Sequence, residues 1–371
     1  MEFTCNTKPL SDGLSLGVIN QNVSKFYKKS CLAQVSVADS STLKVNLEAA
    51  SLKTEISVKG HADGSPSAPI FVDSLLFKQL MSTLDSNTVS LSLEESGLRI
   101  VSGKSKFTLP KMVETSDLEL SAPDMPESVV SSFDKVDKEG WKFIKEHQMY
   151  AIAMSFVTPV YTKVWVGESG DVLVGDFDNS LFTHSKKGNL RSTCLVSDTI
   201  VNLFNSVPDD AKIKKASDTE YIIYFETDAM TYVSEFTTQL ESDESVGSYN
   251  SEIILGMMKG DEDNCIKVDP SKISKLLNQA ILISESDDDI TVTIDNNLFT
   301  LKNDKVDGKV EGSASKEIKF SLDFNIESLK SVVSNYGDSE VFVTPIYQDG
   351  ESAGLLFWNK DLCTLISGSE E

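Results

Sequence analysis

Cysteine, arginine and long apolar runs are all scarce in this chain of 371 residues. Its five cysteines are far apart, odd in number and never spaced as Cys-x-x-Cys. This pattern argues against a disulfide framework and against a zinc site, and it favours a reducing cytoplasm. No apolar stretch approaches the roughly 18 residues that a membrane helix needs.

Catalytic patterns are missing as well. The three histidines, His61, His147 and His184, are isolated, and no local signature joins one of them to a Ser or Cys nucleophile. Gly103-Lys104-Ser105 lacks the upstream glycine of a phosphate-binding loop, and Asp287-Asp288-Asp289 lacks the alternating ligands of a calcium loop. We therefore expect no enzyme, no metal and no cofactor.

The charge of the chain is strongly negative, at −23 from 57 acidic and 34 basic residues. As a global average, this value speaks against nucleic acid as a partner. Binding depends on where the positive side chains lie, however, and Arg99 and Arg191 are the only arginines. Lysine suits phosphate, whereas bidentate reading of guanine favours arginine, so any contact with DNA should lack sequence preference.

A short module appears three times, about 125 residues apart, which is a typical length for one domain. Each copy consists of an apolar pair, a capping residue and a short helix with apolar residues three and four apart. The copies begin at Phe71, Leu195 and Phe324. A chain that repeats a whole domain without a catalytic cluster favours an architecture over an active site.

Each third of the chain also indicates a second helix. We place these helices at Leu10–Val18, at Val136–Met154 and from Pro270 onward, where Asp269 is the cap. Alternating strands and turns surround the helices, so each third should hold two copies of a strand, a helix and three strands. The connections are too short for crossover helices, and the predicted fold is α+β with largely antiparallel sheets.

Two segments rich in Asp, Ser, Glu and Pro, 121–127 and 239–245, resemble linkers between the thirds. They predict three domains, at 1–124, 125–250 and 251–371.

The middle helix carries the clearest chemical pattern. Lys135, Lys138, Lys142 and Lys145 fall within an arc of about 80° on a helix, and Lys272 and Lys275 repeat the pattern on a smaller scale. A charge run is usually a solvated face. Here the stripe is nearly of one sign in an acidic protein, and corresponding helices of two thirds share it, so we interpret it as a phosphate-binding face.

The segment from Phe71 to Leu109 resembles the end of the first domain of bacterial sliding clamps, the beta subunit of the replicative polymerase. The stretch Ser102-Gly103-Lys104-Ser105-Lys106-Phe107 is the most specific part, and the opening Met1-Glu2-Phe3-Thr4 is also similar. The middle and last thirds match by pattern, so that the resemblance covers essentially the whole chain. The richness in lysine suits a phage-encoded or low-GC member.

The resemblance implies a ring of two three-domain chains, closed head to tail around duplex DNA, with helices lining the hole and sheets outside. Such a processivity factor has a DNA polymerase and a clamp loader as partners and works in the cytoplasm of a bacterial or phage-infected cell. Acidic sheets would then repel DNA outside while lysines hold it inside. By resemblance, the DNA-binding set also includes Lys25, Lys28 and Lys29 in the loop after the first helix. We further expect Lys78 and Lys330, on the helices of the repeated module, to belong to this set.

The resemblance further implies a groove for partner peptides between the second and third domains. Its expected residues are Phe177, Leu181, Phe182, Leu365 and Ile366. This chain has Phe-Asp-Asn-Ser where bacterial clamps have a Thr-Asp-Gly-His-like turn, so its partner peptides should differ from the usual motif. The alternative hypothesis is a non-catalytic multi-domain scaffold or surface protein that binds other proteins through its acidic sheets.

Overall fold

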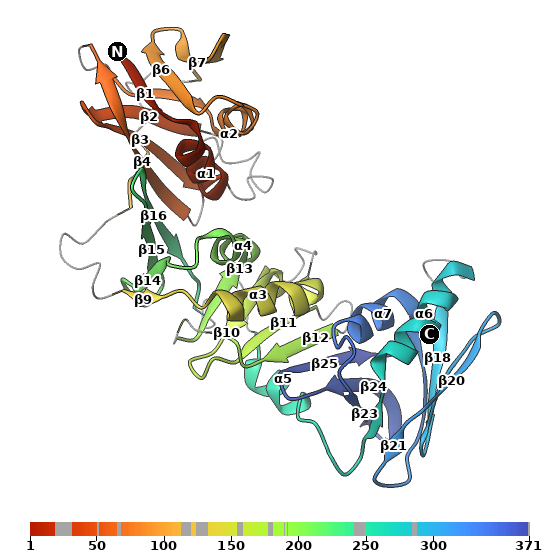
Figure 1. The fold of residues 1–371 in the computed structure, drawn as a ribbon. Coiled ribbons are helices and arrows are strands. Elements are labelled where there is room, and N and C mark those ends of the chain that lie inside the picture. Colours follow the sequence, from red (N-terminus) through yellow and green to blue (C-terminus); the bar gives the residue numbers. More distant parts are fainter. Residues whose placement is uncertain are drawn as a thin grey trace. The chain divides into compact units, whose positions relative to one another are not determined.

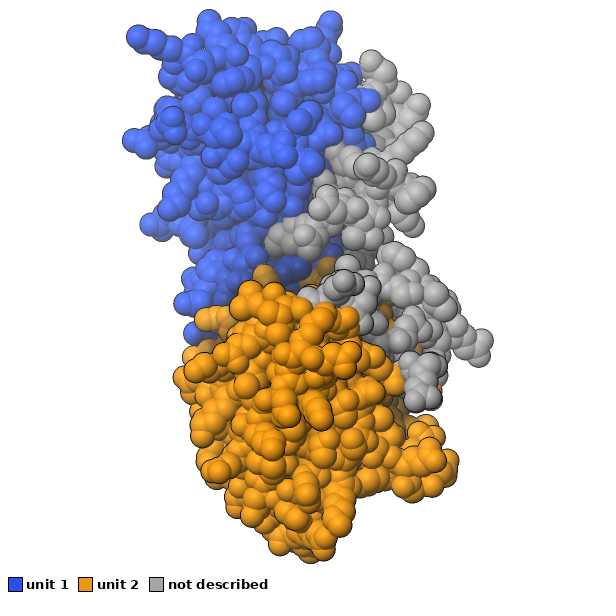
Figure 2. All heavy atoms as spheres, turned by 90° about the vertical axis from the view of Figure 1, so that its right-hand side faces the viewer, with its two compact units in different colours: residues 1–138, 199–239 blue, residues 139–198, 240–371 orange. Residues whose placement is uncertain are grey.

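The structure is a computed structural model, and it describes residues 1–18, 32–49, 52–64, 68–112, 120–123, 133–153, 159–176, 181–188, 190, 192–240, 249–283 and 288–369. The chain folds into two compact units (Figure 2): unit 1 comprises residues 1–138 and 199–239, and unit 2 comprises 139–198 and 240–371. Residues of the predicted second domain contribute to both units, and the three-domain division stays a prediction. Within the described ranges, no helix combines the length and the apolar character needed to span a membrane.

The element order follows one pattern six times, namely a strand, a helix and three further strands (Figure 1). The first two repeats consist of β1 (Glu2–Asn6), α1 (Thr7–Gly17), β2 (Leu32–Asp39), β3 (Thr42–Ala49) and β4 (Leu52–Asp63), then β5 (Ile70–Asp73), α2 (Ser74–Ser82), β6 (Thr88–Glu94), β7 (Gly97–Ser102) and β8 (Ser105–Pro110). The next two consist of β9 (Asp134–Lys135), α3 (Lys138–His147), β10 (Lys163–Val166), β11 (Val172–Asp176) and β12 (Leu181–Ser185), then β13 (Cys194–Ser197), α4 (Asp198–Ser206), β14 (Lys212–Lys215), β15 (Glu220–Glu226) and β16 (Met230–Thr237).

The last two repeats consist of β17 (Ile266–Val268), α6 (Pro270–Ile283), β18 (Asp289–Asp295), β19 (Leu298–Lys302) and β20 (Asp307–Glu311), then β22 (Lys319–Asn325), α7 (Ile326–Ser334), β23 (Val341–Gln348), β24 (Glu351–Trp358) and β25 (Leu362–Ser367). The additional elements are α5 (Ser251–Met257), β21 (Ser313–Ala314) and two 3-10 helices, Met149–Ala151 and Pro159–Thr162. The predicted repeat of strand, helix and three strands is confirmed.

The strands pair antiparallel in the described part of the chain, as predicted. Unit 1 holds a 12-stranded sheet with the order β8-β7-β6-β1-β4-β16-β15-β14-β9, to which β2, β3 and β5 attach. Unit 2 holds a nine-stranded sheet, β13-β10-β11-β12-β25-β24-β23-β17-β21, and a four-stranded sheet, β20-β19-β18-β22. The pairs β4–β16 and β12–β25 join repeats that are distant in sequence, and we call these two pairs the seams.

Three helices begin where the sequence predicts a cap. The Asp73 carboxylate accepts a hydrogen bond from the amide of Leu76 at 2.8 Å. The Asn325 side chain accepts one from the amide of Ser328 at 3.0 Å. Asp269 accepts one from the amide of Ser271, also at 3.0 Å. Each contact satisfies a backbone N–H group that has no partner within the first helical turn. Because donor and acceptor are close in sequence, these helix starts can be predicted from the local sequence.

The predicted helix Val136–Met154 is wrong in its bounds. Lys135 lies in β9, opposite Lys212 of β14, and the amide of Val136 donates to the carbonyl of Ala211 at 3.0 Å. Pairing with a distant strand therefore keeps these residues extended, and α3 begins only at Lys138. The helix ends at His147 and a 3-10 helix follows, while Met154 falls outside the described residues. Consequently, Lys135 is not part of a helical stripe.

Candidate nucleic-acid interface and peptide groove

Helix α3 has a clear inner and outer face. Trp141 and Ile144 are fully buried, whereas Lys142 and Lys145 are exposed on the other side. The ammonium group of Lys142 lies 3.7 Å from the carboxylate of Glu146, one turn further along. Such an exposed pair is weak and readily exchanged for another anion. The structure therefore leaves the lysine pair accessible to phosphate.

Lys138 is positioned differently from its two neighbours in the predicted stripe. Its half-buried ammonium group donates to the carbonyl of Asn205 at 2.7 Å, and it also donates to the carbonyl of Val207. Burial lowers the pKa of this lysine, although the nearby Asp209 opposes the shift. Carbonyls at a helix end lack partners within the helix and favour a cation, so Lys138 caps the end of α4.

Lys78 of α2 makes the same kind of contact in another helix pair. Its ammonium group donates to the carbonyl of Val18, the residue at the C-terminal end of α1, at 3.0 Å. Burial lowers its pKa. Two of the lysines predicted to bind DNA thus hold a neighbouring helix end in the described structure.

Helices α6 and α7 lie side by side (Figure 1) and carry the second lysine face. Ile273 and Leu277 are buried, while Lys272 and Lys275 are exposed. A surface pocket of about 430 Å³ opens between the two helices, with Lys275 in its wall. Lys330 of α7 is half-buried. Lys25, Lys28 and Lys29 lie outside the described residues.

Four of the five residues predicted for the peptide groove lie on β12 and β25. Leu181 stands opposite Ile366, and Phe182 stands opposite Leu365. Because successive strand residues point to opposite faces, Phe182 and Leu365 share one face of the sheet while Leu181 and Ile366 share the other. All four are buried. Phe177 lies outside the described residues.

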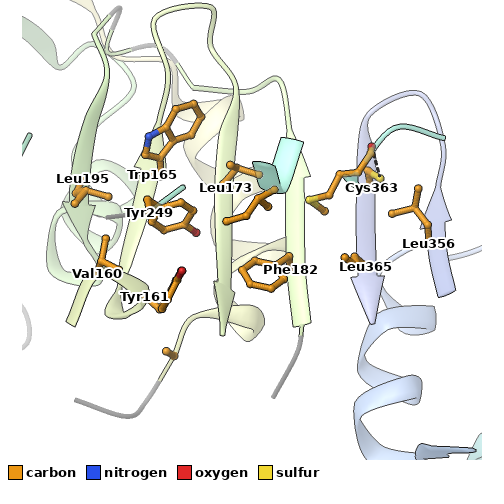
Figure 3. Close-up of a cluster of buried hydrophobic side chains, with 13 residues drawn as sticks. Val160, Tyr161, Trp165, Leu173, Phe182, Leu195, Tyr249, Leu356, Cys363 and Leu365 are labelled. Atoms are coloured by element: carbon orange, nitrogen blue, oxygen red, sulfur yellow. Dashed lines mark hydrogen bonds between the residues drawn. The ribbon is translucent and has the colours of Figure 1, made fainter. Parts of the chain in front are cut away.

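The face of Phe182 and Leu365 carries a buried cluster that is rich in aromatic side chains (Figure 3). Its other members include Trp165, Tyr249 and Leu356. The two predicted groove residues on this face are part of that core. Helix α5 adds Ile254 and Met258, at its end, to the same cluster.

Several exposed apolar side chains were not singled out from the sequence. Ile253 and Met257 stand one turn apart on α5, and Ile253 is 64% exposed. At the end of α6, Leu282 is 83% exposed and Ile283 is 54% exposed. An apolar pair that breaks the three-and-four spacing at a helix end is the signal that could have found Leu282 and Ile283.

Comparison with known proteins gives a consistent result for the fold. No protein-family model matches the chain, and no curated protein matches it. The DNA polymerase III beta subunit of Thermotoga maritima is similar over 100% of this chain and 99% of its own, with a TM-score of 0.76 at 15% identity. The DNA polymerase sliding clamp of Caulobacter crescentus has a TM-score of 0.75 at 16% identity, and the DNA polymerase III subunit beta of Pseudomonas aeruginosa has 0.72 at 14%, with all chains fully covered.

The chain has the sliding-clamp fold. The likeness spans both compact units, so that the sliding-clamp fold accounts for the whole chain and for its six repeats. The resemblance of Phe71–Leu109 to bacterial sliding clamps is therefore confirmed at the level of the fold.

Proposed function

We propose that this chain is a sliding clamp that encircles duplex DNA as a processivity factor for a replicative DNA polymerase. The fold supports this proposal, together with the accessible lysines on α3 and α6. Lys142, Lys145, Lys272 and Lys275 would contact phosphates without reading bases. A clamp needs no catalytic group, since its topology and not its affinity keeps it on DNA.

The observation that carries the proposal is the pattern of strand pairing between repeats. In both seams, the last strand of an odd repeat pairs with the last strand of an even repeat: β4 of the first with β16 of the fourth, and β12 of the third with β25 of the sixth. The remaining strands in these positions are β20 of the fifth repeat and β8 of the second. Each of them ends its sheet within the described chain. We propose that β20 of one copy pairs with β8 of the next, which gives a head-to-tail homodimer.

The side chains near these two edges fit each other. Leu282 and Ile283 present apolar surface at the end of α6, whereas beside β8 a pocket of about 420 Å³ is lined by Leu76, Phe107 and Leu109, among others. Burial of such surface supplies the main driving force of association.

The charges near the edges differ. The segment around β8 carries Lys104, Lys106 and Lys111, whereas the segment around β20 has no net charge, because it alternates Lys302, Lys305 and Lys309 with Asp304, Asp307 and Glu311. Association of the two edges should therefore depend on apolar surface more than on charge.

Partner proteins would dock through peptides on the α5 side of the Phe182–Leu365 cluster. Ile253 and Met257 are exposed apolar residues of α5 that could contact such a peptide. The polymerase and the clamp loader are the proposed partners, and the proposed location is the cytoplasm of a bacterial or phage-infected cell.

Ring closure is tested first by the mass of the protein in solution. Light scattering should report two chains for the native protein and one chain for Leu282→Glu/Ile283→Glu. The matched control is Ile253→Glu/Met257→Glu, which places the same two charges on exposed apolar sites of α5 and should leave two chains. A native monomer, or equal dissociation of both variants, would contradict the proposed closure.

Encirclement is tested by retention on DNA. After loader-driven assembly on a nicked plasmid, the protein should remain bound to the circle and should be lost when a restriction enzyme linearises the same DNA. Equal loss from both forms would count against a ring.

A further inference from the structure

The pattern of apolar residues in β12 and β25 does not determine the register in which these two strands pair. Register is normally fixed because one face of a strand is apolar and the other polar. Here both faces are apolar: Leu181 and Ile366 lie on one, and Phe182 and Leu365 lie on the other. Another interaction must therefore select the observed pairing.

A buried network of hydroxyl groups crosses this seam. Thr183 stands directly opposite Thr364, and both are fully buried. The hydroxyl of Tyr150 lies 3.1 Å from the Thr183 hydroxyl and 3.3 Å from the Thr364 hydroxyl. The hydroxyl of Tyr336 lies 3.2 Å from that of Thr364 and donates to the carbonyl of Phe357 at 2.7 Å. Because burial raises the pKa of Tyr150 and of Tyr336, the network stays neutral.

The second seam carries the same kind of contact. In β4–β16, Thr54 stands opposite Ser234, and their buried hydroxyl oxygens lie 2.9 Å apart. The Ser234 hydroxyl also contacts the carbonyl of Lys53 at 3.2 Å. Strand β16 is buried at five consecutive positions, so it has no alternation of buried and exposed residues that could fix its register.

A third cross-strand hydroxyl pair provides the contrast. Thr4 stands opposite Ser90 in β1–β6, with their oxygens 2.8 Å apart, and this pair is exposed. Both strands alternate between buried and exposed residues, so hydrophobic patterning already fixes their register. Buried hydroxyl pairs thus occur in the two seams. In β4–β16, strand β4 alternates between buried and half-buried residues but β16 does not, so the alternation of β4 alone does not fix where β16 pairs with it.

We propose that the Thr183–Thr364 pair, bridged by Tyr150, and the Thr54–Ser234 pair fix the register in which the repeats join. A slip by one residue would place Thr183 opposite Cys363 or Leu365 and would leave buried hydroxyl groups without partners. Buried groups of this kind are strongly disfavoured, so the penalty falls on the wrong registers. The pairs act as specificity elements more than as sources of stability.

The register of β12–β25 also decides which side chains form the aromatic cluster. Thr183 and Thr364 are therefore positioning residues for Phe182 and Leu365, which are their neighbours in sequence on the opposite face. The consequence for peptide docking rests on the proposed clamp function, whereas the register itself does not. The experiment below uses the free protein, and so its outcome is independent of DNA, polymerase and ring closure.

A disulfide across the seam can report the register, because His184 stands directly opposite Cys363. In a His184→Cys background, mild oxidation should form a disulfide between positions 184 and 363, quantified by mass spectrometry of linked peptides. The test variant, Tyr150→Phe/Thr183→Val/Thr364→Val, removes the hydroxyl groups that join the two strands while keeping the side-chain shapes, and Tyr336 retains its bond to the carbonyl of Phe357. We expect its trapped fraction to fall at least twofold. Its melting temperature should not fall, since three bonded partners are replaced together by apolar groups of the same shape and the Tyr336 hydroxyl keeps the Phe357 carbonyl as its acceptor.

Two controls accompany the trap. Thr183→Ser/Thr364→Ser retains the hydroxyl groups and should trap as completely as the parent, and Thr4→Val, in the exposed pair, should do so too. Trapping at the parental yield in the triple variant would overturn the proposal. The proposal would also be overturned if the triple variant formed less disulfide and at the same time lost its cooperative melting transition, because that result indicates a general structural role. Failure of His184→Cys alone to form the disulfide would contradict the register itself.

Discussion

The ammonium group of Lys138 lies 2.7 Å from the carbonyl oxygen of Asn205, a residue in the last turn of α4. In the sequence this lysine belongs to an apparently uniform stripe with Lys142 and Lys145. In the structure it is half-buried and caps a helix, whereas the other two are exposed. Its removal should therefore affect stability as well as charge.

Lys138→Met keeps the aliphatic stem and removes the donors. Hydrogen bonds to charged groups are worth about 1.5–3 kcal/mol, so we expect a loss of this order in the free energy of unfolding. Lys142→Met, the matched substitution on the same helix, should cost at most about 0.5 kcal/mol, since it removes only an exposed i,i+4 pair. Urea denaturation measures both, and equal values would refute the capping role.

The contribution of exposed lysines to DNA binding can be read from its salt dependence. Each phosphate contact contributes about −0.9 to the slope of log K against log salt concentration. Lys142→Gln/Lys145→Gln should therefore make the slope less negative by about 2 and weaken binding to any duplex, whatever its sequence. Fluorescence anisotropy across a series of NaCl concentrations gives the slope.

The control for the salt dependence is Lys319→Gln, because Lys319 is a strand residue whose side chain is 75% exposed. It should leave the slope unchanged. If Lys319→Gln changes the slope as much as the pair on α3 does, net charge and not a lysine face governs binding.

Helix starts and turns were predictable because their chemistry is local. Asp73, Asp269 and Asn325 each accept from an amide two or three residues further on, so a short window holds the whole interaction. The turn at Asn296 is local in the same way, since its positive φ of 54° favours Asn.

The contacts of individual lysines could not be predicted from the local sequence. Lys135 is held in a strand by pairing with β14, and Lys138 reaches a carbonyl of another helix, so in both cases the partner is remote in sequence. A periodic pattern cannot distinguish a solvated lysine from one that caps a distant helix. Likewise, the burial of Phe182 depends on β25 and α5, which no local window around Phe182 contains.

Phe182 should behave as a core residue and not as a contact residue. Truncation of a buried Phe costs about 3–5 kcal/mol, so Phe182→Ala should strongly destabilise unit 2. Ile253→Ala, on the exposed face of α5, should change stability by no more than about 0.5 kcal/mol. Thermal unfolding compares the two variants. A mild effect of Phe182→Ala would instead indicate that this face of the sheet is open to a ligand.

The two glycines of α1 allow close packing on strands β3, β4 and β16. A β carbon at Gly13 would come within 2.6 Å of Cγ2 of Ile56 and 2.8 Å of Sδ of Met230, and one at Gly17 within 2.4 Å of Cδ1 of Leu47. Ile56 is fully buried and β-branched, so it cannot easily move away. These glycines weaken the helix in isolation, but they bring it close to all three strands.

Gly13→Ala should therefore destabilise the protein, because overpacking costs about 1–3 kcal/mol and outweighs the gain of about 1 kcal/mol in helix propensity. The matched control is Gly256→Ala in α5, where an added β carbon meets nothing within 4 Å and the propensity gain should remain. The two substitutions should thus shift the urea midpoint in opposite directions. If both substitutions stabilise the protein, α1 can move away from these strands at no cost in the free energy of unfolding. Close packing would then not require glycine at position 13.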